Sequence, residues 1–508
     1  MSEITGRRNF LIRTGAWLGL TSLGPIHRIA GAQRFSRNPF TLGVASGDPS
    51  SDGVVLWTRL APDPLNGGGM PNQAFEVDYL VGEDEKLSRI AAKGKAIASP
   101  NLGHSVHVEL NGLKPGRWYW YQFRAGGHES TIGRTRTAPA AASDGMRFAF
   151  ASCQHYESGF YTAYQHMAEE DLDLVIHLGD YIYEGRPNPR VRSHNSAEIV
   201  SLDDYRNRYA LYKSDAFLAR AHARFPWLVT WDDHEVDNDY AGDSPEDKQT
   251  RQEFLERRAN AYQVYYETMP LRRATMPKGS NMLLYRKVGF GGIADFFVLD
   301  TRQYRSDQPC GGGVSPLCPG AISPGQTILG AAQREWLFKE LRASKARWKV
   351  LAQQVPVGAI DLDPGSGQRF SMDKWNGYVA ERSRLLEVLR DGPVANPVVI
   401  TGDVHANWAM NLKVKPEDAR AVATEFVGTS ISSAGDGESL PDRVKAIFPD
   451  NPHVKYFNGQ RGYVKCALRG DRWQSDYRIV PFVTKPGAPV ETAASFVVES
   501  GKPLIERA

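Results

Sequence analysis

The chain has 508 residues, with 61 Lys and Arg against 58 Asp and Glu and a formal net charge of +3 at pH 7. This length exceeds one ordinary hydrophobic core, so two domains are expected. The near balance of charge argues against nucleic acid or an anionic membrane surface as the main partner, and we expect no specific nucleic-acid binding. Beyond the N-terminal segment no stretch approaches 18 apolar residues, so no stable membrane insertion is expected.

The first 32 residues have the pattern of an export signal. Residues 6–11 read G-R-R-N-F-L, a weakly hydrophobic stretch continues to about Gly24, and Ala30-Gly31-Ala32 offers a small-residue cleavage site. We predict a twin-arginine signal peptide over residues 1–32, with the twin-arginine export machinery as partner and a periplasmic or secreted location. The alternative is an ordinary basic N-terminus. Without this segment the chain has 57 basic and 57 acidic residues, so the net charge belongs to the signal.

A first domain is predicted over residues 35–143. Short alternating apolar runs at 54–60, 75–81, 107–110 and 118–124 are separated by Gly, Pro and Asn turns, which is typical of a small antiparallel β-sandwich. The run N-G-L-K-P-G-R-W-Y-W-Y resembles a fibronectin-type strand, turn and strand, and its aromatic residues are expected in the core. The Ala- and Ser-rich residues 138–145 are predicted to be the linker.

A second domain is predicted over residues 146–508, where apolar strands alternate with amphipathic helices. The spacing predicts helices around 160–168 and over 330–343, and the latter leads into a strand at 348–352. This alternation indicates a layered α/β domain. The charged region 185–260 is interpreted as solvated helices and loops around a cleft.

Five apolar runs of this second domain end in side chains that bind metals or transfer protons. In α/β sheets, ligands gather at the carboxyl ends of strands, so we expect these endings to converge. Taken alone, an Asp after a strand also caps helices and a nearby Tyr also packs in cores. The five endings are Cys153; Asp180 with Tyr183; Asp232, Asp233, His234 and Glu235; Gln353 and Gln354; and Asp403 with His405.

Four cysteines are few for an exported chain of this length, so stability does not depend on a disulfide framework. Cys310 and Cys318 flank a Gly- and Pro-containing loop and are the predicted disulfide pair. Cys466 lies in the strand-like run 463–468 and is expected to be buried. For Cys153 a thiolate ligand and an inert buried thiol are equally compatible with the local sequence.

The motifs, in chain order, are Cys153, G-D-Y-I-Y-E, W-D-D-H-E-V-D-N, L-D-T-R-Q-Y-R and G-D-V-H-A-N. In this order, behind a twin-arginine signal and a β-sandwich, they resemble the alkaline phosphatase D (PhoD) family of metallophosphatases, which is related to the purple acid phosphatases. The resemblance covers nearly the whole chain. It implies an α/β fold, namely a four-layer αββα metallophosphatase sandwich preceded by a small antiparallel, fibronectin-like β-sandwich. It also implies Fe³⁺ with Ca²⁺ and hydrolysis of phosphate mono- and diesters.

Carried over by motif, the resemblance implies two ligand sets that share one carboxylate. Asp180 is expected to bridge the two ions, and the oxygen ligands on the second side suit a hard Ca²⁺. Iron would be held by Cys153, Asp180, Tyr183 and His405, and calcium by Asp180, Asp233, Gln354 and Asp403. A second hypothesis places a further calcium on Asp237, Asn238 and Asp239. The alternative is that this acidic turn is only solvated.

Two catalytic roles are predicted beside the ligands. His234 would protonate the leaving alkoxide or hold a phosphoryl oxygen, and the alternative is a core histidine bonded to Glu235 or Asp237. Arg302, and in addition Arg305, would clamp phosphate oxygens, or instead form a salt bridge to Asp300. Asn407 and His155 are expected to orient the ligands.

The function predicted from these features is a secreted metal-dependent phosphoesterase that acts on phosphate-ester small molecules. One alternative keeps the site but acts on phospholipids as a phospholipase D-type phosphodiesterase, because the specificity loops are not assigned. The other is a non-catalytic secreted binding protein with a structural metal site. Against it, a structural site needs closed coordination and no spare proton donor, whereas His234 and Arg302 flank the ligands.

Overall fold

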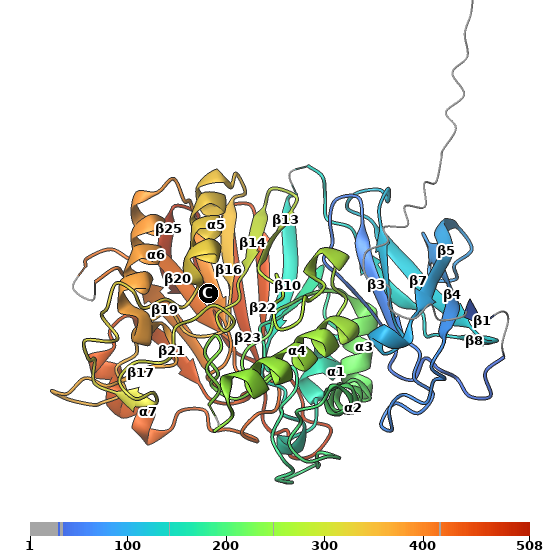
Figure 1. Cartoon of the computed structure of the whole chain (residues 1–508). Helices are drawn as coiled ribbons and strands as arrows, with labels where there is room; N and C mark the ends of the chain where they lie inside the picture. The colour runs from blue at the N-terminus through green and yellow to red at the C-terminus, as the bar shows by residue number, and fades with distance from the viewer. Residues whose placement is uncertain (1–28, 31–33, 142, 247, 416–417) are drawn as a thin grey trace, which may run out of the picture.

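The computed structural model describes residues 29–30, 34–141, 143–246, 248–415 and 418–508 (Figure 1). The predicted signal peptide therefore lies outside the described residues, apart from Ile29–Ala30, which form β1. Among the described residues, no helix is both long and apolar enough to cross a membrane.

The N-terminal part of the chain builds a β-sandwich around its own apolar cluster. A six-stranded sheet packs against β2, β3 and β6, and Val54, Leu56, Tyr121 and Phe123 lie in the core between them. Tyr119, Tyr121 and Phe123 of the aromatic stripe are thus core, as predicted, whereas Trp118 and Trp120 are half-buried outside this cluster. The strands of the six-stranded sheet are β1 (Ile29–Ala30), β4 (Ala74–Gly82), β5 (Ile90–Ala98), β7 (Trp118–Ala125), β8 (His128–Glu129) and β9 (Gly133–Arg136).

A ten-stranded sheet runs through both halves of the chain in the order β25-β24-β23-β22-β10-β11-β12-β2-β3-β6. The join is the parallel pairing of Trp227 with Gly47, where a Cβ on Gly47 would lie 2.7 Å from the Trp227 carbonyl oxygen. The segments on either side of residues 138–145 therefore share a sheet. The strands are β2 (Val44–Gly47), β3 (Val54–Arg59), β6 (Ser105–Leu110), β10 (Gly145–Ala151), β11 (Leu174–His177), β12 (Pro226–Val229), β22 (Arg461–Arg469), β23 (Arg472–Val480), β24 (Glu491–Glu499) and β25 (Lys502–Arg507).

A seven-stranded sheet, β13-β14-β16-β18-β20-β19-β21, packs face to face on the ten-stranded sheet. Alternate residues of each strand point to opposite layers: Phe148 and Val350 meet between the sheets, whereas Ala149 and Leu351 face the helices. The strands are β13 (Arg286–Phe290), β14 (Ala294–Val298), β16 (Trp348–Ala352), β18 (Pro397–Thr401), β19 (Asn407–Leu412), β20 (Ala423–Val427) and β21 (Val454–Asn458).

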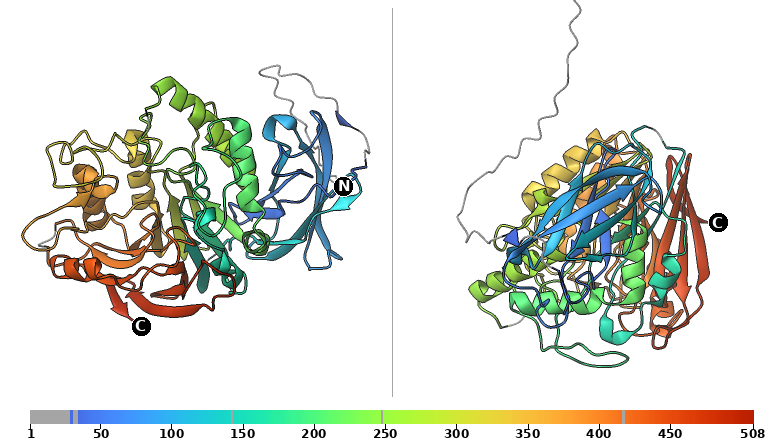
Figure 2. Two further views of the ribbon diagram at one scale, coloured as in Figure 1. Left: turned by 90° about the horizontal axis from the view of Figure 1, so that it is seen from below. Right: turned by 90° about the vertical axis from the view of Figure 1, so that its right-hand side faces the viewer.

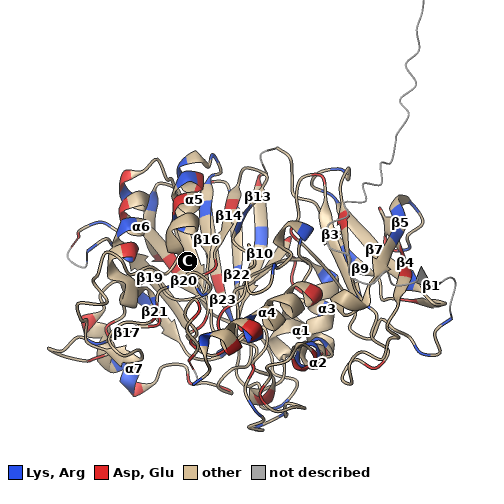
Figure 3. Cartoon of the chain, viewed as in Figure 1, with Lys and Arg blue, Asp and Glu red and all other residues tan. Residues whose placement is uncertain are grey.

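Helices cover the outer face of each large sheet, which completes the predicted four-layer αββα sandwich (Figures 1 and 2). One group packs on the ten-stranded sheet and the other on the seven-stranded sheet. Figure 3 shows acidic and basic residues interspersed on α4, α5 and α6. The first group is α1 (Thr162–Met167), α2 (Leu202–Lys213), α3 (Ala216–Arg224) and α4 (Arg251–Thr268); the second is α5 (Gly330–Ala343) and α6 (Val379–Asp391); a short α7 (Asp442–Ile447) follows β20.

The charged region 185–260 is less solvated than predicted. Arg208 on α2 is buried and donates to the carbonyl oxygen of Gly185, and Arg257 on α4 is buried in an ion pair with Asp237. These charges are internal because loops carrying carbonyl and carboxylate oxygens fold over the two helices. A charged residue in a helix is solvated only where no partner from another segment covers it.

The cysteines follow the sequence prediction. Cys310 and Cys318 form a disulfide with a Cα–Cα distance of 5.7 Å, and Cys466 is buried in β22. The disulfide closes a loop whose β15 (Val314–Ser315) pairs with β17 (Phe370–Ser371). A covalently closed loop thus supports the segment that follows residue 371.

Lys213, the last residue of α2, is a buried lysine with 3% of its surface exposed. Its ammonium lies 4.4 Å from the Trp57 ring centroid and 5.3 Å from that of Tyr181. Burial lowers the pKa of Lys213 from 10.5 to about 7. The folded state therefore takes up this proton less readily than the unfolded chain.

This difference predicts a stability that rises with pH between about 7 and 10.5, because the unfolded chain binds the extra proton in that window. Lys213→Met should remove the dependence and raise the free energy of unfolding at pH 7 by an amount on the order of 4 kcal/mol. Urea unfolding at a series of pH values measures it, with the exposed Lys93→Met as control. A variant profile parallel to that of the unmodified protein would contradict the assignment.

Candidate metal centre

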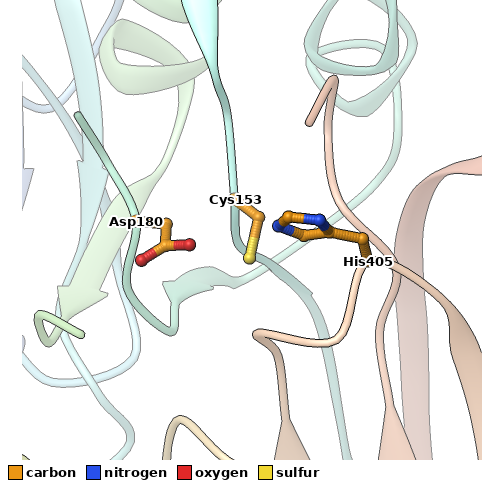
Figure 4. Close-up of side chains that lie close together, drawn as sticks. All are labelled: Cys153, Asp180 and His405. Carbon is orange, nitrogen blue, oxygen red and sulfur yellow. The ribbon is translucent and has the colours of Figure 1, made fainter. Parts of the chain in front are cut away.

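The carboxyl ends of β10, β11 and β18 bring three predicted ligands together (Figure 4). The Cys153 sulfur, an Asp180 carboxylate oxygen and a His405 ring nitrogen lie within 4.8 Å of one another. All three residues have left-handed backbone conformations, with φ of 58°, 56° and 53°. Non-glycine residues adopt this region at a cost, and such strain concentrates at functional sites. The loops are therefore shaped to aim these side chains at one point.

Tyr183, the fourth predicted iron ligand, lies against this group. Its hydroxyl lies 2.8 Å from Asp180 Oδ2, 3.3 Å from His405 Nε2 and 2.7 Å from Ser433 Oγ. Ser433 was not found from the sequence, because a lone serine far along the chain carries no signal. Thiol, carboxyl, phenol and imidazole thus converge in one place, where only the imidazole is half-buried and the other three groups are buried.

Asp180 also belongs to a second group, in which carboxylate oxygens of Asp180, Asp232 and Asp233 lie within 4.8 Å. Asp233 was predicted; Asp232 was singled out at the end of its strand but given no role. Among the described residues, Asp180 Oδ1 and Asp232 Oδ2 are buried without a hydrogen-bond partner. Leaving buried charged oxygens unpaired is costly, and cations would satisfy them. The donor set fits two cations that share Asp180.

The pKa values agree with sites built for cations. Burial and nearby acidic groups raise the pKa of Cys153 and of Asp180 well above the ordinary values, so neither group ionises readily without a positive charge. Burial and the Arg461 charge lower the pKa of His405 to about 3, which keeps its imidazole neutral and available as a ligand. Burial alone would raise the pKa of Asp233, but the positive charges of Arg302 and His234 outweigh it and lower that pKa to about 2.

Asp403 does not join either group in the structure. It has φ of 65°, and its Oδ2 lies 2.5 Å from the Lys374 ammonium. Lys374 also lies 3.0 Å from Asp373 Oδ2. The sequence prediction missed both Lys374 and Asp373, since they lie outside the strand-end motifs.

Gln354 differs from its predicted role as a ligand. Its Nε2 donates to Thr230 Oγ1 at 2.8 Å and to the Leu299 carbonyl oxygen at 2.9 Å, and its Oε1 accepts from Thr301 Oγ1 at 2.7 Å. Both ends of the amide are therefore occupied. The side chain ties three strand ends together instead of facing the carboxylates.

The predicted phosphate clamp is also revised. Arg302 is fully buried; its Nε donates to Asp232 Oδ1 at 2.5 Å, and both terminal nitrogens donate to Asp373 at 2.8 Å. Arg305 donates to Asp373 Oδ1 at 2.6 Å. Asp300, the proposed salt-bridge partner, instead accepts the Arg302 backbone N–H. Both guanidinium groups position carboxylates.

His234 stands beside the ligands with a defined orientation. Its Nδ1 lies 2.8 Å from Glu184 Oε2, and its ring centroid lies 4.1 Å from that of Tyr183. Both partners of the core alternative are bonded elsewhere: Glu235 accepts the backbone N–H groups of Asp180, Tyr181 and Asp232, and Asp237 is paired with Arg257. Burial acts to lower the pKa of His234, but Glu184 and Asp180 outweigh it and hold the pKa well above its ordinary value.

Of the two residues predicted to orient the ligands, His155 lies beside the site and Asn407 does not. His155 packs edge-on against the Tyr183 ring at 4.4 Å. Asn407 accepts the Thr429 backbone N–H, and no contact between Asn407 and the ligands is found in the described part of the chain.

The hypothesis of a further calcium on residues 237–239 is not supported. Asp237 is paired with Arg257 at 2.9 Å, and the Asp239 backbone N–H donates to Asp233 Oδ2 at 2.7 Å. The Asn238 backbone N–H likewise donates to Glu184 Oε1 at 3.0 Å. This turn fixes the acids around it instead of forming a site of its own.

Comparison with known proteins gives consistent matches along the chain. The family model "PhoD-like phosphatase" matches residues 148–477, and "PhoD-like phosphatase, N-terminal domain" matches residues 27–139. The chain is 52% identical over 498 residues to alkaline phosphatase D of Bacillus subtilis (strain 168), covering 96% of this chain and 85% of that protein. It matches a solved structure of PhoD with a TM-score of 0.92 and 52% identity, over 94% of this chain and 93% of that one.

A more distant structural match is the purple acid phosphatase PPD1 from yellow lupin, with a TM-score of 0.55 and 14% identity over 90% of this chain and 73% of that one. At 14% identity this match shows a similar fold and nothing about function. It agrees with the layered architecture described above.

Because Asp180 belongs to both donor groups and Gln354 to neither, replacing each residue should have a different effect on the metal content. Asp180→Asn should empty both cation sites, since both ligand groups lose a carboxylate. Gln354→Leu should retain both metals and lower the free energy of unfolding by roughly 1–3 kcal/mol, because the buried Thr301 hydroxyl loses its acceptor and Thr230 and the Leu299 carbonyl group each lose one hydrogen bond. Elemental analysis of the purified variants decides it. Loss of one metal from a folded Gln354→Leu variant would restore Gln354 as a ligand.

Proposed function

The chain belongs to the PhoD-like phosphatase family and is a phosphatase of the hydrolase class, and from this premise we propose that it is an exported phosphoesterase using Fe³⁺ and Ca²⁺ to hydrolyse phosphate mono- and diesters. The observation that supports this most is the pair of buried donor groups sharing Asp180, with the His234–Glu184 pair beside them. A binding protein would have no use for an oriented proton donor at this point.

The two donor groups differ in chemistry, which supports two different ions. Cys153, Tyr183, Asp180 and His405 offer thiolate, phenolate, carboxylate and imidazole, and anionic ligands of this kind stabilise a trivalent iron. Asp180, Asp232 and Asp233 offer carboxylate oxygens suited to calcium, and Asp403 is the further candidate once its ion pair with Lys374 is exchanged. When bound, the ions supply Lewis-acid polarisation and a water of lowered pKa.

The residues of the chain supply the proton for the leaving group. Glu184 holds Nδ1 of the charged His234, which leaves the Nε2 proton available for the ester oxygen. As the oxygen of water forms its bond to phosphorus, the bond from phosphorus to the ester oxygen breaks and that oxygen takes the Nε2 proton. The attacking water loses one proton to the solvent as it becomes a phosphoryl oxygen, and His234 takes one proton back from the solvent. A monoester gives phosphate and an alcohol, and a diester gives a phosphate monoester and an alcohol.

We also propose that the protein is exported in a folded state. Residues 6–11 carry the paired arginines, and the Cys310–Cys318 disulfide suits an oxidising compartment outside the cytoplasm. The twin-arginine route would carry the chain after folding, to the periplasm or beyond.

The ligand assignment predicts a visible absorption band from charge transfer between thiolate or phenolate and iron. Protein exported by its own signal should contain iron and calcium, and the band should change in Tyr183→Phe and in Cys153→Ser, because each variant removes one donor. Elemental analysis with a visible spectrum measures this. Zinc or manganese in place of iron, without the band, would end the iron and calcium assignment.

The proton-donor role predicts a dependence on the leaving group. The metal-loaded protein should hydrolyse both a monoester and a diester, and His234→Ala should lose roughly 10²–10⁴-fold in kcat on alkyl esters. The loss should be much smaller on nitrophenyl esters, whose leaving group needs no proton. Steady-state kinetics on matched ester pairs give the answer.

The control is His166→Ala, since that imidazole bonds the Ala488 carbonyl oxygen away from the ligands. Equal losses on both ester types would remove His234 as the donor. A loaded wild-type protein without phosphoesterase activity would overturn the proposed function itself.

A further inference from the structure

A cationic side chain beside the metal groups would add to the binding of a substrate phosphate, but the two arginines predicted for this role are already paired with carboxylates. Arg302 and Arg305 have no exposed side-chain surface and bond the buried carboxylates of Asp232 and Asp373. Lys374 belongs to the same cluster of charges, but 16% of its side chain is exposed. Among the described cations that contact these acids it is the one that reaches the surface.

The backbone around Lys374 is firmly held. The preceding strand β17 pairs with β15 of the disulfide-closed loop, and the Met372 backbone N–H donates to the Gly313 carbonyl oxygen at 2.8 Å. On the other side Trp375 is fully buried, with its indole N–H bonded to Gln353 Oε1 at 3.1 Å. Only the end of the lysine side chain is therefore free to change partners.

The two anionic partners of Lys374 are not equivalent. Asp373 also receives both terminal nitrogens of Arg302, as well as Arg305 and Gln308, so it stays neutralised if the ammonium moves. Asp403, at 2.5 Å, is the partner that a cation in the second site would take over. The ammonium would then lack an anion on the side that faces the metal groups.

We propose that Lys374 binds a non-bridging phosphoryl oxygen of the substrate, exchanging its contact with Asp403 for one with the phosphate when the site is loaded. This inference rests on the proposed function and adds the residue that binds its substrate. A compact ammonium on a flexible stem suits the exchange, since it needs no fixed geometry at either partner. Lys374 thus takes the place that sequence reasoning gave to Arg302.

The test uses the metal-loaded enzyme and inorganic phosphate as the probe. Lys374→Met should keep both metals, weaken phosphate binding measured by calorimetry about 10- to 100-fold, and raise KM for monoesters by a similar factor, since one charged hydrogen bond is lost. Lys374→Arg should retain most of the phosphate affinity. Lys287→Met is the matched control, because its ammonium is paired with Glu340 away from the site.

Two results would overturn the inference while leaving the proposed function in place. One is a Lys374→Met enzyme that hydrolyses esters with unchanged KM and binds phosphate as the wild type does. The other is a variant with a raised calcium content and unchanged phosphate affinity, which would mean that the lysine only competes with the cation. If Lys374→Met does not fold, the Lys374→Arg enzyme decides, and a phosphate affinity 10-fold or more below wild type would contradict the role. Failure of the wild-type enzyme itself to act on esters would instead remove the proposed function.

Discussion

Negative charge buried at the ends of parallel strands is the constraint on which this structure depends. Asp180, Asp232 and Asp233 lie together under the surface, and the Cys153 thiol adds a further acidic group beside them. Such a cluster is stable only with positive charge close by. The two large sheets, the left-handed turns after the strands and the surrounding arginines all serve to hold these acids at distances that cations can bridge.

The positive charges around the acids form two classes. Arg302 and Arg305 lie inside the protein and are fixed by several hydrogen bonds each, so they balance part of the charge permanently. Lys374 lies at the edge with two contacts, and His234 is held through one nitrogen. Permanent pairing makes the site rigid, whereas the loosely held groups remain available to a substrate.

Sequence patterns predicted the parts of the site that depend on local order. Helix 330–343 and strand 348–352 follow from periodicity, and the convergence of Cys153, Asp180, Tyr183 and His405 follows from motifs at strand ends. The roles of Arg302 and Gln354 were predicted differently, because their partners come from distant segments: Asp373 for one, Thr230 for the other. The shared sheet was missed for the same reason, since nothing near residue 47 indicates a partner at residue 227.

The ten-stranded sheet also governs the order in which the chain can fold. Strand β10 lies between β11 and β22, and β2 pairs with β12. During synthesis, β2 and β10 are therefore complete long before their partners β12 and β22. Contacts of such long sequence separation slow folding and leave strand edges open meanwhile. The sheet closes only when residues 461–469 are available. A chain that stops short of them would expose the flank of a central strand, and such fragments should aggregate rather than persist as smaller folded units.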